Sequence, residues 1–325
     1  MIQIKKFKAT DKEFIDIARI RNLVNHDSID HPDEDKNDWK IRDKSLIRDR
    51  LLCYNDNMLI GLLYYVQGRD ENSRTCFFNI VIDPQYYNNG YRELLYQEML
   101  KKIKKFNGNK LFGHVYDHAN YRNHQKLLIK HNFKLVQTNR EYSCDIRQVN
   151  TEKYQPLIKK LESEGIKFYD SRDEMLDWKN HYKKLEELEW ILDQDIPHPD
   201  GIKPTRMPFK QWKKLVLDFY NNSYGIDIVA VNDGKYIGST DIEVYPKSEP
   251  HKGWTGGLGV IREFRRKGIA TALKIKAIEA LLKKGITEIR TDNEENNPMY
   301  KINVALGFKP VPFSLEYIKK IKDKE

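Results

Sequence analysis

The sequence predicts an α/β protein made of two successive units, each a central mixed sheet with helices on both faces. Three observations support this fold class. Segments with the periods of helices and strands follow one another in the same coarse order in both halves. Short stretches of the first half recur in the second. In each half, a glycine-bearing loop separates an apolar strand from a helix.

The elements of the first half are predicted from periodicity, with strands at residues 2–8, 58–67, 75–82, 110–116 and 134–145, and helices at residues 12–24, 39–52, 92–105 and 123–131. In the second half we expect helices at residues 178–192, 209–220, 271–282 and 299–305, and strands at residues 226–231, 236–245, 253–260 and 286–291. The turn Asn232-Asp233-Gly234 is a hairpin signal.

An internal duplication accounts for the repeated order. When Phe133 is set on Phe308, Asn132 falls on Gly307, and both residue types suit a left-handed helix cap. At the same offset Glu141-Tyr142 falls on Glu316-Tyr317. We therefore predict domains at residues 1–147 and 156–325, joined by a polar linker at residues 148–155.

Composition favours a soluble globular protein of 325 residues, with 39% hydrophobic and 32% charged residues. The net charge is +9, but its densest run, at residues 101–105, lies at a predicted helix end where cations stabilise the helix dipole. We expect no nucleic-acid partner, although net charge alone leaves that reading open. Positive charge also suits an anionic cofactor.

Cys53, Cys76 and Cys144 have no paired or zinc-binding spacing, which favours a reducing compartment. No histidine pattern has metal-ligand spacing, so no metal is predicted. The amino terminus lacks a signal peptide and no window has eighteen apolar residues. The expected location is cytoplasmic, without membrane attachment, as a monomer or homodimer.

The loop with the most specific pattern follows the strand Gly257-Leu258-Gly259-Val260 and reads Arg265-Arg266-Lys267-Gly268-Ile269-Ala270-Thr271. Helix first turns present unpaired backbone N–H groups and favour negative charge. Gly268 and Ala270 are small enough for a phosphate to approach these amides, and three cations stand beside them. The loop is therefore predicted to hold a pyrophosphate. Neither a P-loop nor a dinucleotide fingerprint is present.

A second motif follows the strand at residues 286–291, and it comprises Asn293, Asn296, Met299, Asn303, Leu306, Gly307 and Phe308. The two motifs together resemble the coenzyme A loop and the following helix of the GNAT superfamily of N-acetyltransferases. The overall arrangement is similar to tandem-GNAT proteins of the mycothiol synthase type, in which the C-terminal copy is usually the active one. The resemblance implies two tandem GNAT folds with mostly antiparallel sheets.

The resemblance also implies acetyl-CoA as co-substrate, with pantetheine lying between two splayed strands. Leu258 and Val260 would bind its backbone-like amides, with Val260 N–H as donor to the thioester oxygen. The loop residues, together with Asn293, Asn296 and Met299, complete the predicted cofactor site. Many members have a tyrosine at position 303 that protonates the leaving thiolate, whereas this chain has Asn303. Tyr300 is therefore a candidate for that role, and the alternative is release of the thiolate to water.

The N-terminal counterpart of the loop, Tyr87-Asn88-Asn89-Gly90-Tyr91-Arg92, keeps the glycine but lacks the basic triplet. We interpret the first domain as a degenerate copy; the competing interpretation is that Arg92 binds phosphate directly. In the second domain, Glu243 is the candidate proton acceptor, on one strand face with Asp241 and Tyr245. An exposed carboxylate paired with lysine is the alternative for Glu243.

Asp195 and His198 are candidates for acceptor binding, because family members meet their acceptor in the loop between the first two helices; a simple turn role is the alternative for His198. The sequence thus predicts an acetyl-CoA-dependent N-acetyltransferase acting on a primary amine of a small molecule. The alternative from a different class is a non-catalytic acyl-CoA-binding or sensing protein, which the missing tyrosine at position 303 motivates.

Overall fold

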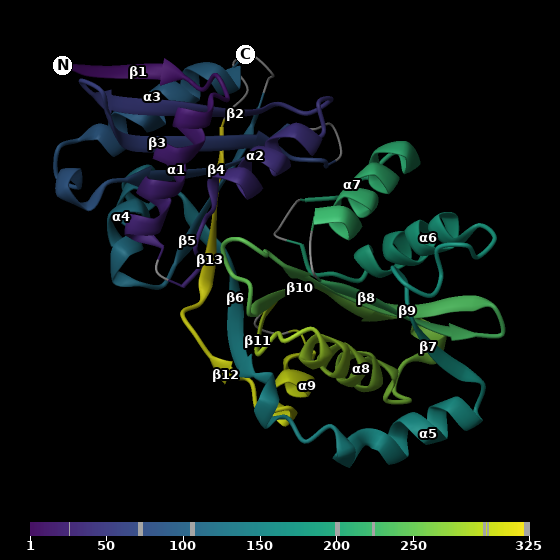
Figure 1. Ribbon diagram of the computed structural model, residues 1–325. Helices are drawn as coiled ribbons and strands as arrows, with labels where there is room; N and C mark the ends of the chain where they lie inside the picture. The colour runs from purple at the N-terminus through teal and green to yellow at the C-terminus, as the bar shows by residue number, and fades with distance from the viewer. Residues whose placement is uncertain are drawn as a thin grey trace. The chain divides into compact units, whose positions relative to one another are not determined.

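The computed structural model describes residues 1–25, 27–70, 74–104, 108–198, 202–222, 225–294, 297 and 299–321. By compactness the chain divides into an N-terminal unit (Met1–Arg140, His198–Thr205 and Pro312–Glu325) and a C-terminal unit (Glu141–Pro197 and Arg206–Val311). Figure 1 traces the chain through them. The predicted domain limits at residues 147 and 156 stay predictions. The compact units differ from them in placing residues 141–147 in the C-terminal unit, and residues 198–205 and 312–325 in the N-terminal unit.

The N-terminal unit is built on a sheet whose strand order is β1-β2-β3-β4-β5-β13-β6. Neighbouring strands are antiparallel except for the parallel pair β4 and β5. The elements are β1 (Ile2–Lys6), α1 (Asp11–Val24), α2 (Pro32–Ile41), β2 (Arg48–Asn55), β3 (Met58–Gln67), β4 (Thr75–Ile82), α3 (Tyr91–Ile103), β5 (Lys110–Tyr116), α4 (Arg122–Lys130), β6 (Lys134–Asp145) and β13 (Ser314–Lys320).

Helices cover both faces of this sheet because the strand side chains alternate between two apolar cores. Leu52 and Tyr54 of β2 pack in a core with Phe14 of α1, whereas Leu51 and Cys53 pack in another core with residues of α3. A capping box at Thr10 and Glu13 fixes the start of α1.

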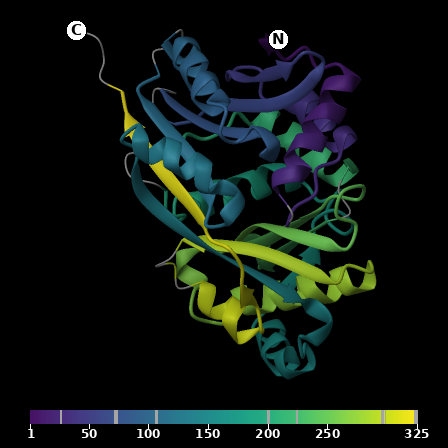
Figure 2. The same ribbon diagram turned by 90° about the vertical axis from the view of Figure 1, so that its left-hand side faces the viewer.

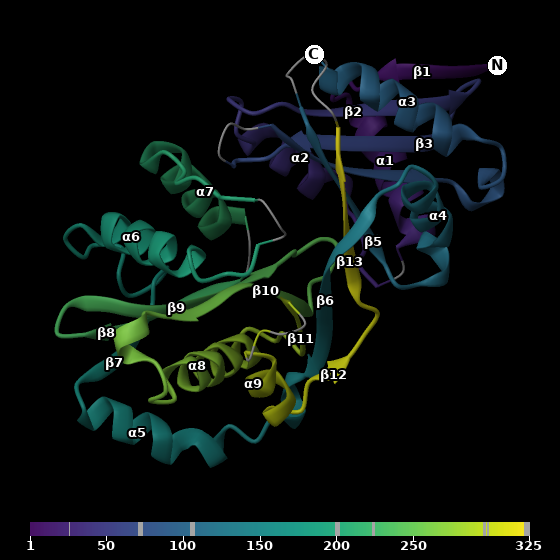
Figure 3. The same cartoon turned by 180° about the vertical axis from the view of Figure 1, so that it is seen from behind.

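The last strand of the described residues, β13, completes the N-terminal unit. It pairs with β5 from Ser314↔Tyr116 to Lys320↔Lys110, and on its other edge with β6. Figure 3 shows β13 between β5 and β6, and Figure 2 shows the same yellow strand from another side. Tyr317 and Ile318 are buried there. Residues near the C-terminus therefore supply part of a core that begins at the N-terminus.

The C-terminal unit has the strand order β11-β10-β9-β8-β7, with the end of β6 beside β11 and β12 beside β6. The pair β10 and β11 is parallel, and β7 to β10 are antiparallel. Its elements are α5 (Gln155–Ser163), β7 (Ile166–Asp170), α6 (His181–Asp193), α7 (Phe209–Asn222), β8 (Ile226–Asn232), β9 (Lys235–Val244), β10 (Lys252–Val260), α8 (Ile269–Lys283), β11 (Glu288–Glu294), α9 (Tyr300–Ala305) and β12 (Lys309–Pro310).

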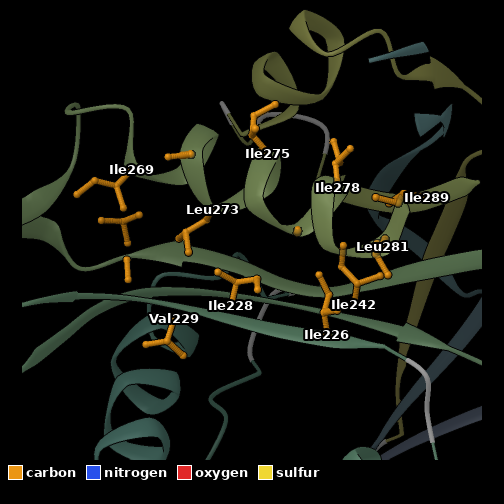
Figure 4. Close-up of a cluster of buried hydrophobic side chains, with 14 of the residues drawn as sticks. Ile226, Ile228, Val229, Ile242, Ile269, Leu273, Ile275, Ile278, Leu281 and Ile289 are labelled. Carbon is orange, nitrogen blue, oxygen red and sulfur yellow. The ribbon is translucent and has the colours of Figure 1, made fainter. Parts of the chain in front are cut away.

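The helix α8 is the central helix of this unit. Its residues Leu273 and Leu281 are buried and point toward the isoleucines of β8 and β9 in Figure 4. The opposite face of the same strands is covered by α6, which packs against α7. The C-terminal unit is therefore an α/β sandwich with its largest apolar core under α8.

Most predicted elements are confirmed within a few residues. The hairpin at Asp233 and Gly234 has positive φ at both residues, and Asn132 and Gly307 are left-handed, as predicted. The predicted helix at residues 39–52 is wrong. Residues 48–55 form β2, which pairs with both β1 and β3, and the helix α2 lies earlier. The elements α5, β7, β12 and β13 were not predicted as such.

Candidate functional site

The predicted pyrophosphate loop lies at the start of α8. Gly268 is the N-cap with φ +88°, and no side chain caps the helix there. The amides of Ile269, Ala270 and Thr271 belong to the first turn and have no intrahelical acceptor. The first turn of α8 carries no acidic residue. This helix end is therefore suited to an anion.

Glycine is required at position 268 for two reasons. Its positive φ is costly for other residues, and a Cβ placed there would lie 2.8 Å from the Leu157 side chain of α5. The Leu157 side chain thus packs closely against the loop at Gly268. A substitution of Gly268 would disturb the loop backbone as well as any ligand contact.

The three cationic side chains of the loop differ in their contacts and in their exposure. Arg265 donates from Nε to the Val260 carbonyl at 2.8 Å and forms an ion pair with Asp195. Asp195 also pairs with Arg262, and these hydrogen bonds hold the pKa of its carboxyl below the usual value. Arg266 and Lys267 are exposed. Asp195, predicted to bind an acceptor, is thus in contact with two arginines beside the loop.

The strands β10 and β11 separate in the way that the resemblance implies. Their pairing ends at Trp254 and Arg290, although both strands continue beyond these residues. The Ile261 N–H donates to the Ile237 carbonyl on the β9 side at 2.9 Å. Because backbone groups alternate along a strand, the N–H groups of Leu258 and Val260 point away from β9, toward the gap. Both predicted residues therefore present backbone donors at an open strand edge.

A β-bulge lies just before these residues. The register with β9 shifts between Thr255 and Gly257, so Gly256 is the extra residue. The carboxyl group of Asp241 lies so close to Gly256 that a Cβ there would overlap it. The bulge thus brings a carboxylate of β9 against the backbone of β10, two residues before Leu258.

Asp241 belongs to a group of three carboxyls that sequence reasoning missed as a unit. Asp227 of β8 is paired directly with Asp241 in the sheet. The third member, Glu189 of α6, is electrostatically coupled to both. Trp212 Nε1 donates to Glu189 at 2.5 Å and the Tyr220 hydroxyl donates to Asp227 at 2.7 Å. We call these three residues the acidic group.

Burial raises the pKa of each member, and the neighbouring negative charges raise it further. The pKa of Asp227 rises to about 6, that of Asp241 to about 7 and that of Glu189 to about 8. The carboxyls of the acidic group therefore change from protonated to ionised near neutral pH, whereas ordinary surface carboxyls are already ionised there. A signal existed in the sequence, since Asp241 alternates with Glu243, but burial depends on α6 and α7.

The remaining predicted residues are distributed around β9, β11 and α9. Glu243 accepts a hydrogen bond from the Tyr245 hydroxyl at 2.8 Å. Tyr300 is the first residue of α9 and packs against the core, and Met299 is its N-cap. Asn296 lies outside the described residues. His198 belongs to the compact N-terminal unit.

At position 303, where the resemblance implies a tyrosine, a buried asparagine forms a hydrogen bond with a buried lysine. Asn303 is 2% exposed and accepts from Lys274 Nζ at 2.7 Å. Its own amide donates to Asn293 Oδ1 at 2.8 Å. The second motif is thus tied to α8 through hydrogen bonds.

The N-terminal counterpart of the site contains the buried side chain of Arg92. Gly90 aligns with Gly268, so Ile80 aligns with Leu258 and Arg92 with Ala270. Arg92 is 8% exposed and donates to the Ile80 carbonyl, and burial lowers its pKa to about 10. The guanidinium therefore points into the unit. Thr271 has Glu93 as its counterpart, an acid in the first turn of α3.

Two absences concern the described residues only. Within them, no helix is long and apolar enough to cross a membrane. Among the same residues, no group of three or more His, Cys, Asp or Glu side chains could hold a metal ion. Cys53, Cys76 and Cys144 are free and buried.

Comparison with known sequences identifies the central part of the second half. Residues 185–306 match the acetyltransferase (GNAT) family. One curated relative, the N-alpha-acetyltransferase MAK3 of Arabidopsis thaliana, is 25% identical over 107 residues. The match covers 33% of this chain, and the chain spans about half the length of that relative.

Comparison with solved structures covers the whole chain. A tandem GNAT protein from the clavulanic acid biosynthesis pathway superposes with a TM-score of 0.78 at 14% identity, covering 100% of both chains. A GCN5-related N-acetyltransferase from Sphaerobacter thermophilus gives 0.69 at 16% identity, covering 100% of this chain and 97% of that chain. At this identity the comparisons establish the fold.

Proposed function

With residues 185–306 in the GNAT acetyltransferase family and the whole chain in the tandem GNAT fold, we propose that this protein is an acetyl-CoA-dependent N-acetyltransferase. Its acceptor is a primary amine of a small molecule, and the reaction takes place in the C-terminal unit. The observation that carries the proposal is the gap between β10 and β11 beside the uncapped first turn of α8. When bound, acetyl-CoA supplies the acetyl group as a thioester.

The geometry of the loop and of the strand edge supports a specific set of residues for binding the co-substrate. The amides of Ile269, Ala270 and Thr271, with Gly268, hold the pyrophosphate, and the exposed Arg266 and Lys267 add charge. Leu258 N–H binds the pantetheine arm at the strand edge. Val260 N–H donates to the thioester oxygen, where negative charge develops. Arg265 occupies the Val260 carbonyl and so fixes this edge.

The proton of the acceptor ammonium goes to a carboxylate of β9. Asp241 lies against the bulge, two residues from Leu258, and its pKa of about 7 suits a general base at neutral pH. Glu243, further along the same strand face, is the second candidate and could act through water. Tyr300 remains the candidate that protonates the departing thiolate of coenzyme A, with release of the thiolate to water as the alternative. Asn293, Asn296 and Met299 remain predicted contacts of the co-substrate.

The N-terminal unit is proposed to be a degenerate copy. Arg92 takes up the Ile80 carbonyl, which corresponds to the carbonyl of Leu258 at the open edge of β10. Glu93 would repel a phosphate at the start of α3. These contacts disfavour the interpretation in which Arg92 binds phosphate.

The decisive test copies the N-terminal residue into the C-terminal site. Thr271→Glu places an acid in the first turn of α8, which stabilises a helix but repels a pyrophosphate. We expect the affinity for coenzyme A, measured by calorimetry, to fall at least about tenfold, equivalent to roughly 1.4 kcal/mol. The control Thr271→Gln should bind within about twofold. Equal affinity of both variants would refute the proposed cradle.

A second function is favoured by Asn303, which replaces the expected phenol with a buried amide. In that case the protein binds acyl-CoA as a sensor without turnover. A broad amine panel scored by free thiol release separates the two. The enzyme releases coenzyme A with at least one acceptor, whereas the sensor binds acetyl-CoA and releases none above the uncatalysed rate.

A further inference from the structure

The second motif contains a chain of three polar side chains, and the proposed function assigns a role to only one of them, Asn293. Lys274 lies in the second turn of α8 and is 1% exposed. Its ammonium donates to Asn303 Oδ1 at 2.7 Å and lies 4.6 Å from the centre of the Phe308 ring. Asn303 Nδ2 in turn donates to Asn293 Oδ1 at 2.8 Å. The chain links α8, α9 and β11.

The ammonium determines the direction of both hydrogen bonds. A lysine ammonium has three donors and no acceptor, so the oxygen of Asn303 must face it. The nitrogen of Asn303 then faces Asn293, which must present its own oxygen inward. Two amide orientations that would otherwise be ambiguous are thereby fixed. The NH₂ group of Asn293 consequently points away from Asn303 and Lys274.

Asn293 lies on the part of β11 that borders the gap. Ile289 is buried in the core beside α8 in Figure 4, and Asn293, four residues further, lies on the same face of the strand. The pairing of β11 with β10 has ended three residues earlier, at Arg290. Asn293 therefore lies on the part of β11 that has separated from β10, and its side chain is partly exposed.

We propose that Lys274 and Asn303 are positioning residues that fix Asn293 as a hydrogen-bond donor toward the gap. The acceptor of this bond is a carbonyl oxygen of the acyl-pantetheine arm. The inference rests on the proposed function, because it requires an acyl-pantetheine between β10 and β11. It also gives the buried lysine a role, since an ammonium without a carboxylate partner is costly in an apolar core.

Among the described residues, one titratable group acts on Lys274 electrostatically. The thiol of Cys144 on β6 is the group that acts on it electrostatically, and that thiol donates to the Leu306 carbonyl at 3.9 Å. Burial lowers the pKa of Lys274 to about 7. The ammonium form, which fixes the direction of the chain, is therefore favoured below neutral pH.

The experiment uses substitutions that keep the lysine paired but break the chain. Asn303→Asp still accepts from Lys274, with a stronger charge-assisted bond, but cannot donate to Asn293. We expect the thermal unfolding midpoint to be maintained or raised, while the affinity for coenzyme A falls about tenfold. A merely structural pair would leave the affinity unchanged.

The matched control is Asn297→Asp. Asn297 accepts from the Met299 N–H through its side-chain oxygen, which an aspartate also supplies, so the same charge is added nearby without touching the chain. Its affinity should stay within about twofold of the unaltered protein. A loss equal to that of N303D would assign the effect to charge and overturn the inference.

A second variant covers the case in which N303D does not fold. In Lys274→Met the amide of Asn303 can adopt both orientations, so about half of the molecules present the correct one. The ¹⁵N signal of the Asn293 side-chain amide should shift in the protein without ligand. An unchanged signal would overturn the inference.

The two proposals fail in different ways. If the unaltered chain does not bind coenzyme A, the proposed function is refuted and the inference falls with it. If the unaltered chain and N303D bind it equally, only the role of Lys274 and Asn303 is refuted.

Discussion

Asp227 on β8 and Asp241 on β9 lie directly opposite each other in an antiparallel pair of strands. They point to the face that is opposite to Ile226, Ile228 and Ile242, which face α8. Two carboxylates in this relation repel each other when both are ionised. The sheet therefore holds at least one of them readily protonated near neutral pH.

Stability should depend on pH through this pair. Both pKa values are higher in the folded protein than in the unfolded chain, so the folded state binds more protons between about pH 4 and 7. Stability consequently falls as pH rises through this range. We expect Asp241→Asn to raise the free energy of unfolding at pH 8 by roughly 1–3 kcal/mol. Urea unfolding at pH 5 and pH 8 measures this, and a stabilisation equal at both pH values would contradict it.

Whereas stability should fall as pH rises, the rate of catalysis should increase. If Asp241 accepts the proton, Asp241→Asn lowers kcat by roughly 10²–10⁴ and leaves the KM for acetyl-CoA nearly unchanged. The kcat of the unaltered protein should rise between pH 6 and pH 8, as the carboxyl with a pKa of about 7 loses its proton. Glu243→Gln is the comparison on the same strand face. A larger loss in that variant would transfer the role to Glu243.

The close contact between Gly256 and Asp241 at the β-bulge predicts that a substitution at one position can be compensated at the other. An alanine at position 256 would overlap the Asp241 carboxyl, so Gly256→Ala should cost roughly 1–3 kcal/mol of stability. The double variant Gly256→Ala with Asp241→Ala should recover most of this loss, because the overlapping atoms are gone. Thermal unfolding of the four members of the cycle provides the measurement. Additive losses would show that the two residues do not compete for this space.

The C-terminal strand predicts that the two halves cannot be separated by cutting between residues 147 and 156. A fragment of residues 150–325 lacks β6, which lies beside β11 and β12, and carries β13 without its partners. We expect this fragment to be insoluble. A chain ending at Val311 should lose the cooperative unfolding of the N-terminal unit, and a peptide of residues 312–321 should restore it. A stable chain ending at Val311 would argue against this role of β13.

The local features of the site could be predicted from the sequence because they depend on backbone rules. Gly268 is left-handed at the N-cap of α8, and Gly307 is left-handed after α9. The strand before the loop and the helix after it are where periodicity places them. Residues whose role follows from local conformation can be recognised without tertiary contacts.

Buried charge could not be predicted in the same way. Residues 48–52 resemble a charged helix face, yet Arg50 is fully buried in β2. Its guanidinium forms an ion pair with Asp35 and lies 5.2 Å from the Trp39 ring. A pattern that counts charges as exposed therefore places a helix where a strand lies. Lys274 and Asp227 were missed for the same reason, since each is buried against a partner from another element, Asn303 of α9 and Tyr220 of α7.

The path of β13 has a consequence for how this protein is made. A ribosome releases residues 110–145 long before residues 314–320, so the facing edges of β5 and β6 wait without a partner for most of translation. Exposed strand edges are sites of aggregation. Nascent chains of this protein should accordingly depend on chaperones until the final strand has emerged.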